Sequence, residues 1–136
     1  MFTSVSTRAS SAYKRVAAET GVQGADPHQL VGMLYDALLQ SMNQARGAIE
    51  RGEVEVKGAA LGKAVRILEE GLKGGLNMAQ GGELAQNLNG LYGYAVQRLT
   101  LANLRNDLAL VTEVIGLIEP LADSWKQIRT GALQGA

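Results

Sequence analysis

The stretch from Gly82 to Asn103 carries two apolar stripes on one predicted helix. At about 100° per residue, the first stripe falls within an arc of about 60°, as a core-facing stripe should. It comprises Leu84, Leu88, Leu91, Ala95, Leu99 and Ala102. The second stripe lies well away from the first and comprises Gly90, Tyr94, Gln97, Leu101 and Leu104. Because one stripe suffices for a bundle core, the second is a candidate binding surface.

Helix start and stop signals divide the chain into four predicted helices, 27–51, 55–79, 83–105 and 108–129. Asp26 and Pro27 form an N-cap followed by proline at the first helical position. Gly52 is placed to end the first helix, and Asn106 with Asp107 gives a tight turn with a capping residue. Short connections favour antiparallel neighbours. The sequence therefore predicts an all-α, antiparallel, up-down four-helix bundle.

The second predicted helix is rich in glycine. Its expected inner face comprises Leu61, Val65, Leu68, Leu72 and Leu76. Another strip, which includes Ile67, Gly71, Gly74 and Met78, projects to a different side. An interior glycine costs about 1 kcal/mol relative to alanine, so this helix is expected to depend most on tertiary packing.

The fourth predicted helix is apolar over nearly half its circumference, which is wider than a core stripe needs. The residues at the edges of this extra apolar width are Leu110, Leu117, Leu121 and Ile128. Trp125 is expected to anchor the core rather than contact a partner. Tyr35 and Tyr92 are expected to pack with their hydroxyl groups reaching the surface.

Composition excludes several classes of function. The chain has no cysteine, and its 13 basic residues balance 13 acidic ones without gathering on one helix face, so we predict no nucleic-acid binding. No apolar run reaches the roughly 18 residues of a membrane span, so we expect no membrane insertion and a cytoplasmic location. His28 is the single histidine, expected to be solvated or capping. We therefore expect no metal site, no cofactor and no enzymatic activity.

The N-terminal residues 1–25 hold many Ser, Thr and Gly and read as a flexible arm. Tyr13 and Val16, at helical spacing, would let a short extra helix form against a binding surface. The arm is thus a candidate self-masking cap over the groove. The bundle is expected over 26–130, followed by a flexible tail at 131–136.

The sequence resembles the flagellin-specific export chaperones of the FliS family between Tyr13 and Trp125. The fairly specific part is Leu91-Tyr92-Gly93-Tyr94 followed by Arg98-Leu99 and Ala102-Asn103. Other matching motifs are Ala12-Tyr13, Pro27-His28-Gln29-Leu30, Met33-Leu34-Tyr35-Asp36, Gly81-Gly82-Glu83-Leu84, Asp107, Glu113-Val114 and Trp125. Asp26, where the family often has Ser, and the glycine-rich second helix are modest departures.

The resemblance implies a cytoplasmic chaperone that binds the disordered C-terminal segment of flagellin, prevents premature polymerisation and assists delivery to the flagellar type III export apparatus. It also implies that Tyr13 contacts the export-gate protein. The candidate partner-binding residues are Ile67, Gly71, Met78, Gly90, Tyr94, Leu101, Leu104, Leu110, Leu117, Leu121 and Ile128. Contacts between neighbouring helices of the bundle would explain the same stripes equally well. The alternative functions are a bundle that homodimerises through these stripes and a chaperone for another filament subunit.

Overall fold

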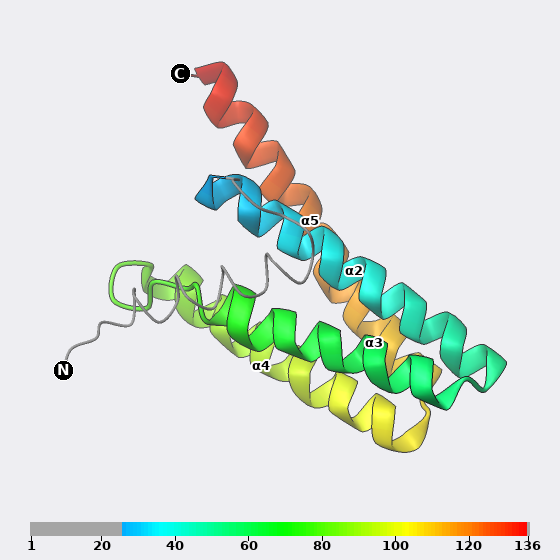
Figure 1. Cartoon of the computed structure of the whole chain (residues 1–136). Coiled ribbons are helices and arrows are strands. Elements are labelled where there is room, and N and C mark those ends of the chain that lie inside the picture. The colour runs from blue at the N-terminus through cyan, green and yellow to red at the C-terminus, as the bar shows by residue number, and fades with distance from the viewer. Residues whose placement is uncertain (1–25, 136) are drawn as a thin grey trace.

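The computed structural model describes the backbone of residues 26–135 and the side chains of residues 26–128. Its elements are α2 (Pro27–Arg51), α3 (Val54–Arg66), the π-helix η1 (Ile67–Lys73), α4 (Gly82–Arg105) and α5 (Leu108–Gly135), and residues 26–135 contain no strand. Figure 1 shows each long helix doubling back on the one before it, with η1 continuing α3. The predicted all-α four-helix bundle is confirmed.

The helix termini form where the sequence signals place them. The Asp26 carboxylate accepts a hydrogen bond from the Gln29 N–H at 2.7 Å, with proline next to the cap. Gly52 ends α2 with a φ of 71°, a left-handed conformation that glycine adopts without steric cost. The Asp107 carboxylate accepts from the Ala109 N–H at 3.0 Å and caps α5. These predictions of local structure are confirmed.

The core lies along the bundle axis, where α2 packs against α3 and α5, and α4 packs against α5 and η1. All four helices contribute fully buried apolar side chains to it. Prominent among them are Leu34, Leu38, Met42, Leu61, Ile67, Leu68, Leu99, Val111, Val114 and Ile118. No helix within the described range is long and apolar enough to cross a bilayer.

The second predicted helix differs most from the expectation. Regular α-helix ends at Arg66, π-helix follows to Lys73, and turns take the place of helix up to α4. The prediction of a helix continuing to Ala79 is therefore wrong. The glycines clustered here, Gly74, Gly75, Gly81 and Gly82, lower helix propensity at the point where the helix stops.

The first turn of α4 is also placed differently from the prediction. Leu84, expected in the core, is 67% exposed, whereas Tyr92 is only 2% exposed. η1 ends at Lys73, and the helices of residues 26–135 bury Ala85 of this turn, at 4% exposed, but not Leu84. Further along α4, Ala95, Leu99 and Ala102 are buried as predicted.

Two predicted segments fall at the limits of the described chain. The arm at 1–25, with Tyr13 and Val16, lies outside the described residues. α5 extends to Gly135, so the boundary predicted at residue 130 falls inside this helix.

Candidate binding site

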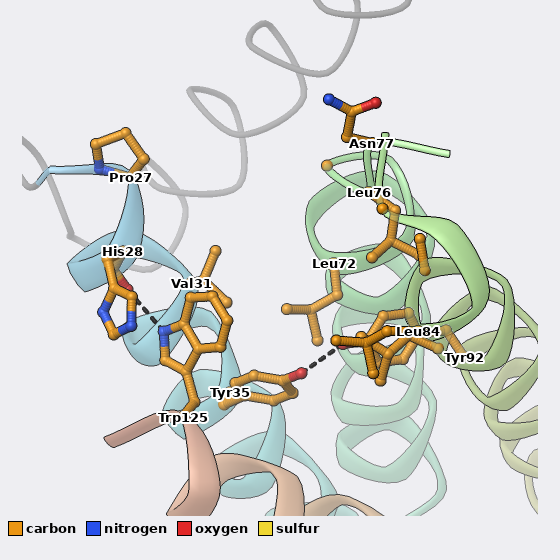
Figure 2. Close-up of a pocket in the computed structure, with 14 residues that line it drawn as sticks. Pro27, His28, Val31, Tyr35, Leu72, Leu76, Asn77, Leu84, Tyr92 and Trp125 are labelled. Carbon is orange, nitrogen blue, oxygen red and sulfur yellow. Dashed lines mark hydrogen bonds between the residues drawn. The ribbon is translucent and has the colours of Figure 1, made fainter. Parts of the chain in front are cut away.

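An apolar cavity of 440 Å³ opens at the end of the bundle where α2 and α4 begin. Residues from α2, η1, the following turn, α4 and α5 converge on it (Figure 2). They are Pro27, His28, Val31, Tyr35, Leu72, Gly75, Leu76, Asn77, Gly81, Leu84, Ala85, Leu88, Tyr92 and Trp125. A concave, mostly apolar site of this size can bury a large side chain or a small ligand.

Two tyrosines pair on one side of the cavity. The hydroxyl groups of Tyr35 on α2 and Tyr92 on α4 hydrogen-bond to each other in the interior (Figure 2). Burial raises the pKa of Tyr35 above its ordinary value, against the smaller opposing effect of the hydrogen bond from Tyr92. The expectation that both hydroxyls reach the surface is wrong. Buried hydroxyl groups need partners, and these two supply one to each other.

Trp125 forms the wall contributed by α5. Its indole ring stacks on the His28 ring with centroids 4.2 Å apart and an interplanar angle of 13°. Its Nε1–H donates a hydrogen bond to the His28 carbonyl at 2.8 Å. The stacking contact and this hydrogen bond both hold the indole ring in place. Trp125 packs against the core as predicted and also lines the cavity.

His28 is held in this wall rather than solvated as expected. Both of its ring nitrogens are buried and have no hydrogen-bond partner among residues 26–128. The ring therefore contributes its flat face to Trp125, in an aromatic contact worth about 1 kcal/mol beyond its buried area.

The sequence-predicted partner-binding residues lie elsewhere, since none of them lines the cavity. Those exposed at the surface are Met78, Gly90, Tyr94, Leu104 and Ile128. Those half-buried are Leu101, Leu117 and Leu121. Those buried inside the bundle are Ile67, Gly71 and Leu110. The expectation that these three lie on an accessible stripe is wrong for this conformation, because neighbouring bundle helices cover them.

The second stripe of α4 includes a polar cluster that joins it to α5. Tyr94 donates its hydroxyl hydrogen bond to the Glu113 carboxylate, and Arg98 Nε lies 2.8 Å from the other Glu113 oxygen. The Arg98 guanidinium also lies 5.6 Å from the centre of the Tyr94 ring. The Tyr94 hydrogen bond and then the Arg98 contacts lower the pKa of Glu113, and the same Tyr94–Glu113 hydrogen bond raises the pKa of Tyr94.

The cavity lining is mostly apolar and carries few polar groups. Its lining holds one imidazole, two hydroxyl groups paired with each other and one amide among apolar side chains. No group of metal-ligating side chains occurs in the part of the chain that the structure describes. The arrangement can bury an apolar side chain of a partner against the aromatic wall.

Comparison with known proteins agrees with the resemblance read from the motifs. The model of the family described as flagellar protein FliS matches residues 9–132. The chain belongs to the FliS family. The match covers nearly the whole chain, including every element that lines the cavity.

Several relatives that are similar in sequence to this chain are named flagellar secretion chaperones. The FliS of Salmonella typhimurium is 48% identical over 117 residues, which cover 86% of this chain and 87% of the relative. FliSB of Pseudomonas aeruginosa is 40% identical over 121 residues, which cover 89% of this chain and 95% of the relative. FliS of Bacillus subtilis is 36% identical over 109 residues, covering 80% of each.

Sequence reasoning did not find the cavity, although two signals for it are present. The glycine cluster from Gly74 to Gly82 marks where the second helix stops. Leu84 begins the apolar stripe of α4 at the same end of the bundle, where η1 has already stopped. Together, these two signals indicate apolar surface at this end that the second helix does not cover.

Proposed function

We propose that this FliS family member binds the C-terminal segment of flagellin in the cytoplasm, prevents its premature polymerisation and assists its delivery to the flagellar type III export apparatus. The relatives at 36–48% identity are named flagellar secretion chaperones. The observation that carries the proposal is the apolar cavity, because a chaperone for an unfolded segment needs an uncovered apolar surface.

The cavity supports a mechanism in which the partner inserts an apolar anchor. Leu84, 67% exposed at its rim, and the Trp125 wall would lose water contact when the anchor enters. Full burial of one large apolar side chain contributes about 1.5–3 kcal/mol. Ordering the rest of the segment offsets part of this gain, so several anchors are needed for tight binding.

The exposed outer face of α4 extends the proposed surface. Tyr94 and Leu104 are exposed there, Leu104 to 78%, and Leu84 stands at the start of the same helix. In this proposal the cavity takes the main anchor, and the outer face of α4 contacts a neighbouring part of the segment. Those contacts involve less burial, because the outer face is not concave.

The N-terminal arm is proposed to cover the cavity before flagellin arrives and to contact the export-gate protein through Tyr13. The arm leads directly into Pro27, which lines the cavity, so the chain enters the bundle at this site. Deletion of residues 1–20 should tighten binding of the flagellin segment, as measured by calorimetry. Unchanged affinity, together with unchanged binding of an apolar dye, would count against the cap.

The proposed function is tested by calorimetric titration of the flagellin C-terminal segment into two matched variants, Leu84→Ser at the cavity and Leu104→Ser at the far end of α4. Loss of the Leu84 contact should weaken binding about 10- to 100-fold, from the value of one buried leucine. Leu104→Ser should weaken binding less, about two- to fivefold, because the outer face of α4 buries less of each side chain than the cavity does. Flagellin lacking its C-terminal segment is the negative control.

The other outcomes identify the alternatives. Weakening by Leu104→Ser alone would assign binding to the second stripe of α4. Absence of binding by the unaltered protein would exclude flagellin as the partner. A dimer seen by light scattering that flagellin does not dissociate would favour the homodimer instead.

A further inference from the structure

The helix that contributes Leu72 to the cavity changes its hydrogen-bond pattern just before it ends. The Gly74 N–H donates to the Glu69 carbonyl at 3.0 Å, five residues back, as in a π-helix. The next amide, of Gly75, reaches four residues back to Gly71, and that of Leu76 reaches three back to Lys73. The helix thus passes from wide to tight geometry within three residues and then stops.

At Gly74, where the hydrogen-bond pattern changes, the backbone leaves no room for a side chain. A Cβ atom there would lie 2.6 Å from the Glu70 carbonyl oxygen and 3.2 Å from the Glu69 carbonyl oxygen. Both are backbone atoms, so relief would require the helix itself to move. The close approach accompanies the π-type hydrogen bond, in which the Gly74 N–H bonds to the Glu69 carbonyl rather than to that of Glu70.

The π-helical turn sets the side of the cavity that faces α2. Leu72, within the turn, is 3% exposed and lines the cavity, and Leu76, just beyond it, lines the cavity as well. A regular α-helix through this segment would turn Leu72 about the helix axis and continue past Lys73, so Leu72 and Leu76 would not keep their present places in the cavity wall. π-helical turns occur frequently at functional sites.

We infer that Gly74 is a positioning residue for partner binding, because it permits the π-helical turn that places Leu72 and Leu76 in the cavity wall. The inference rests on the proposed function for the identity of the partner. The part of the inference that links Gly74 to the position of the cavity wall does not depend on which partner binds.

The matched variants are Gly74→Ala and Gly62→Ala. Gly62 lies on α3, and a Cβ added there meets nothing within 4 Å, so its substitution reports only the general effect of removing a glycine from this helix. Trp125, the single tryptophan of the chain, reports on the cavity without a ligand. Acrylamide quenching of its fluorescence should rise in Gly74→Ala and stay unchanged in Gly62→Ala.

Binding is then measured by titration with the flagellin C-terminal segment. Gly74→Ala should weaken binding about tenfold or more while still unfolding cooperatively, because a wall of the pocket is displaced rather than the fold lost. Gly62→Ala should bind like the unaltered protein. Unchanged quenching and unchanged affinity in Gly74→Ala would overturn the inference. Altered quenching in Gly74→Ala with no binding by the unaltered protein would leave the inference standing and refute the proposed function.

A measurement on the unaltered protein guards against a Gly74→Ala variant that does not fold. Through-hydrogen-bond NMR couplings identify the carbonyl that accepts the Gly74 N–H. Coupling to Glu69, with nuclear Overhauser contacts between Leu72 methyl groups and the Tyr92 ring, is the expected result. Coupling to Glu70 would show an α-helical bond and overturn the inference.

Discussion

The two ends of the bundle are completed in different ways. At the closed end, defined by the turns at Gly52 and Asn106, every connection is short and both residues adopt left-handed backbone conformations. Lys57, only 6% exposed, donates hydrogen bonds there to the Asn103 carbonyl at 2.9 Å and to the Asn106 side chain. One buried ammonium thus joins α3 to the turn between α4 and α5.

At the open end, defined by the cavity, the connection between η1 and α4 is a glycine-rich turn. Among the described residues, no helix continues from η1 beside the start of α2, and Leu84 is 67% exposed at the rim. Polar contacts therefore fix one end of the bundle, while the described helices form an apolar cavity at the other, where we propose that the partner binds.

The largest effect on stability is expected from Lys57→Met at the closed end. The substitution keeps most of the apolar stem but leaves two acceptors without the ammonium, which should lower the free energy of unfolding by about 1–3 kcal/mol. Lys63→Met, at a half-exposed position of the same helix, is the control. Denaturant unfolding measures the change. A matching change in acrylamide quenching of Trp125 would contradict the separation of the two ends.

A smaller effect is expected from the tyrosine pair, which joins the core to the open end. Tyr35→Phe and Tyr92→Phe each remove a partner from a buried hydroxyl, and each should lower the free energy of unfolding by about 1–2 kcal/mol. The double variant should lose less than the sum, because the second substitution removes no part of the Tyr35–Tyr92 hydrogen bond that the first has not already removed. Tyr94→Phe, which removes one exposed hydrogen bond to Glu113, is the comparison and should cost less than either buried substitution. Strictly additive losses would show that the hydroxyl pair does not couple α2 to α4.

The smallest effect is expected from Glu113, on the exposed cluster between the two ends. Its folded pKa is lowered from 4.5, first by the Tyr94 hydrogen bond and then by Arg98. A lowered folded pKa gives stabilisation that is complete above the unfolded pKa and is lost as the pH falls through the folded pKa. The difference in melting temperature between the unaltered protein and Glu113→Gln should therefore shrink as the pH falls below about 4.5. Glu119→Gln, at an exposed site on α5, is the control, and a pH-independent difference would refute this role.

Local signals predicted the helix termini correctly. Asp26, Gly52 and Asp107 act on backbone groups within a few residues of themselves, so their effect can be read from sequence alone. The number and approximate extent of the helices follow from these signals. The exception is the second helix, where the π-helical turn depends on a close backbone approach at Gly74 that no residue pattern specifies.

The candidate site was predicted less well, because burial depends on which neighbour each helix face meets. Ile67 was assigned to an accessible strip, yet it is fully buried and belongs to the hydrophobic core. Trp125 was predicted as a core residue, and it packs against the core while it also lines the cavity. A cavity depends on how neighbouring elements pack around a position, and the hydrophobic periodicity of a single helix does not contain that information.

The most direct test of the central claim is an NMR map of the contacts between the protein and a flagellin C-terminal segment. The account predicts intermolecular nuclear Overhauser contacts to the Trp125 indole and the Leu84 methyl groups at the open end. Contacts confined to Tyr94 and Leu104, with the Trp125 indole resonance unshifted, would contradict it.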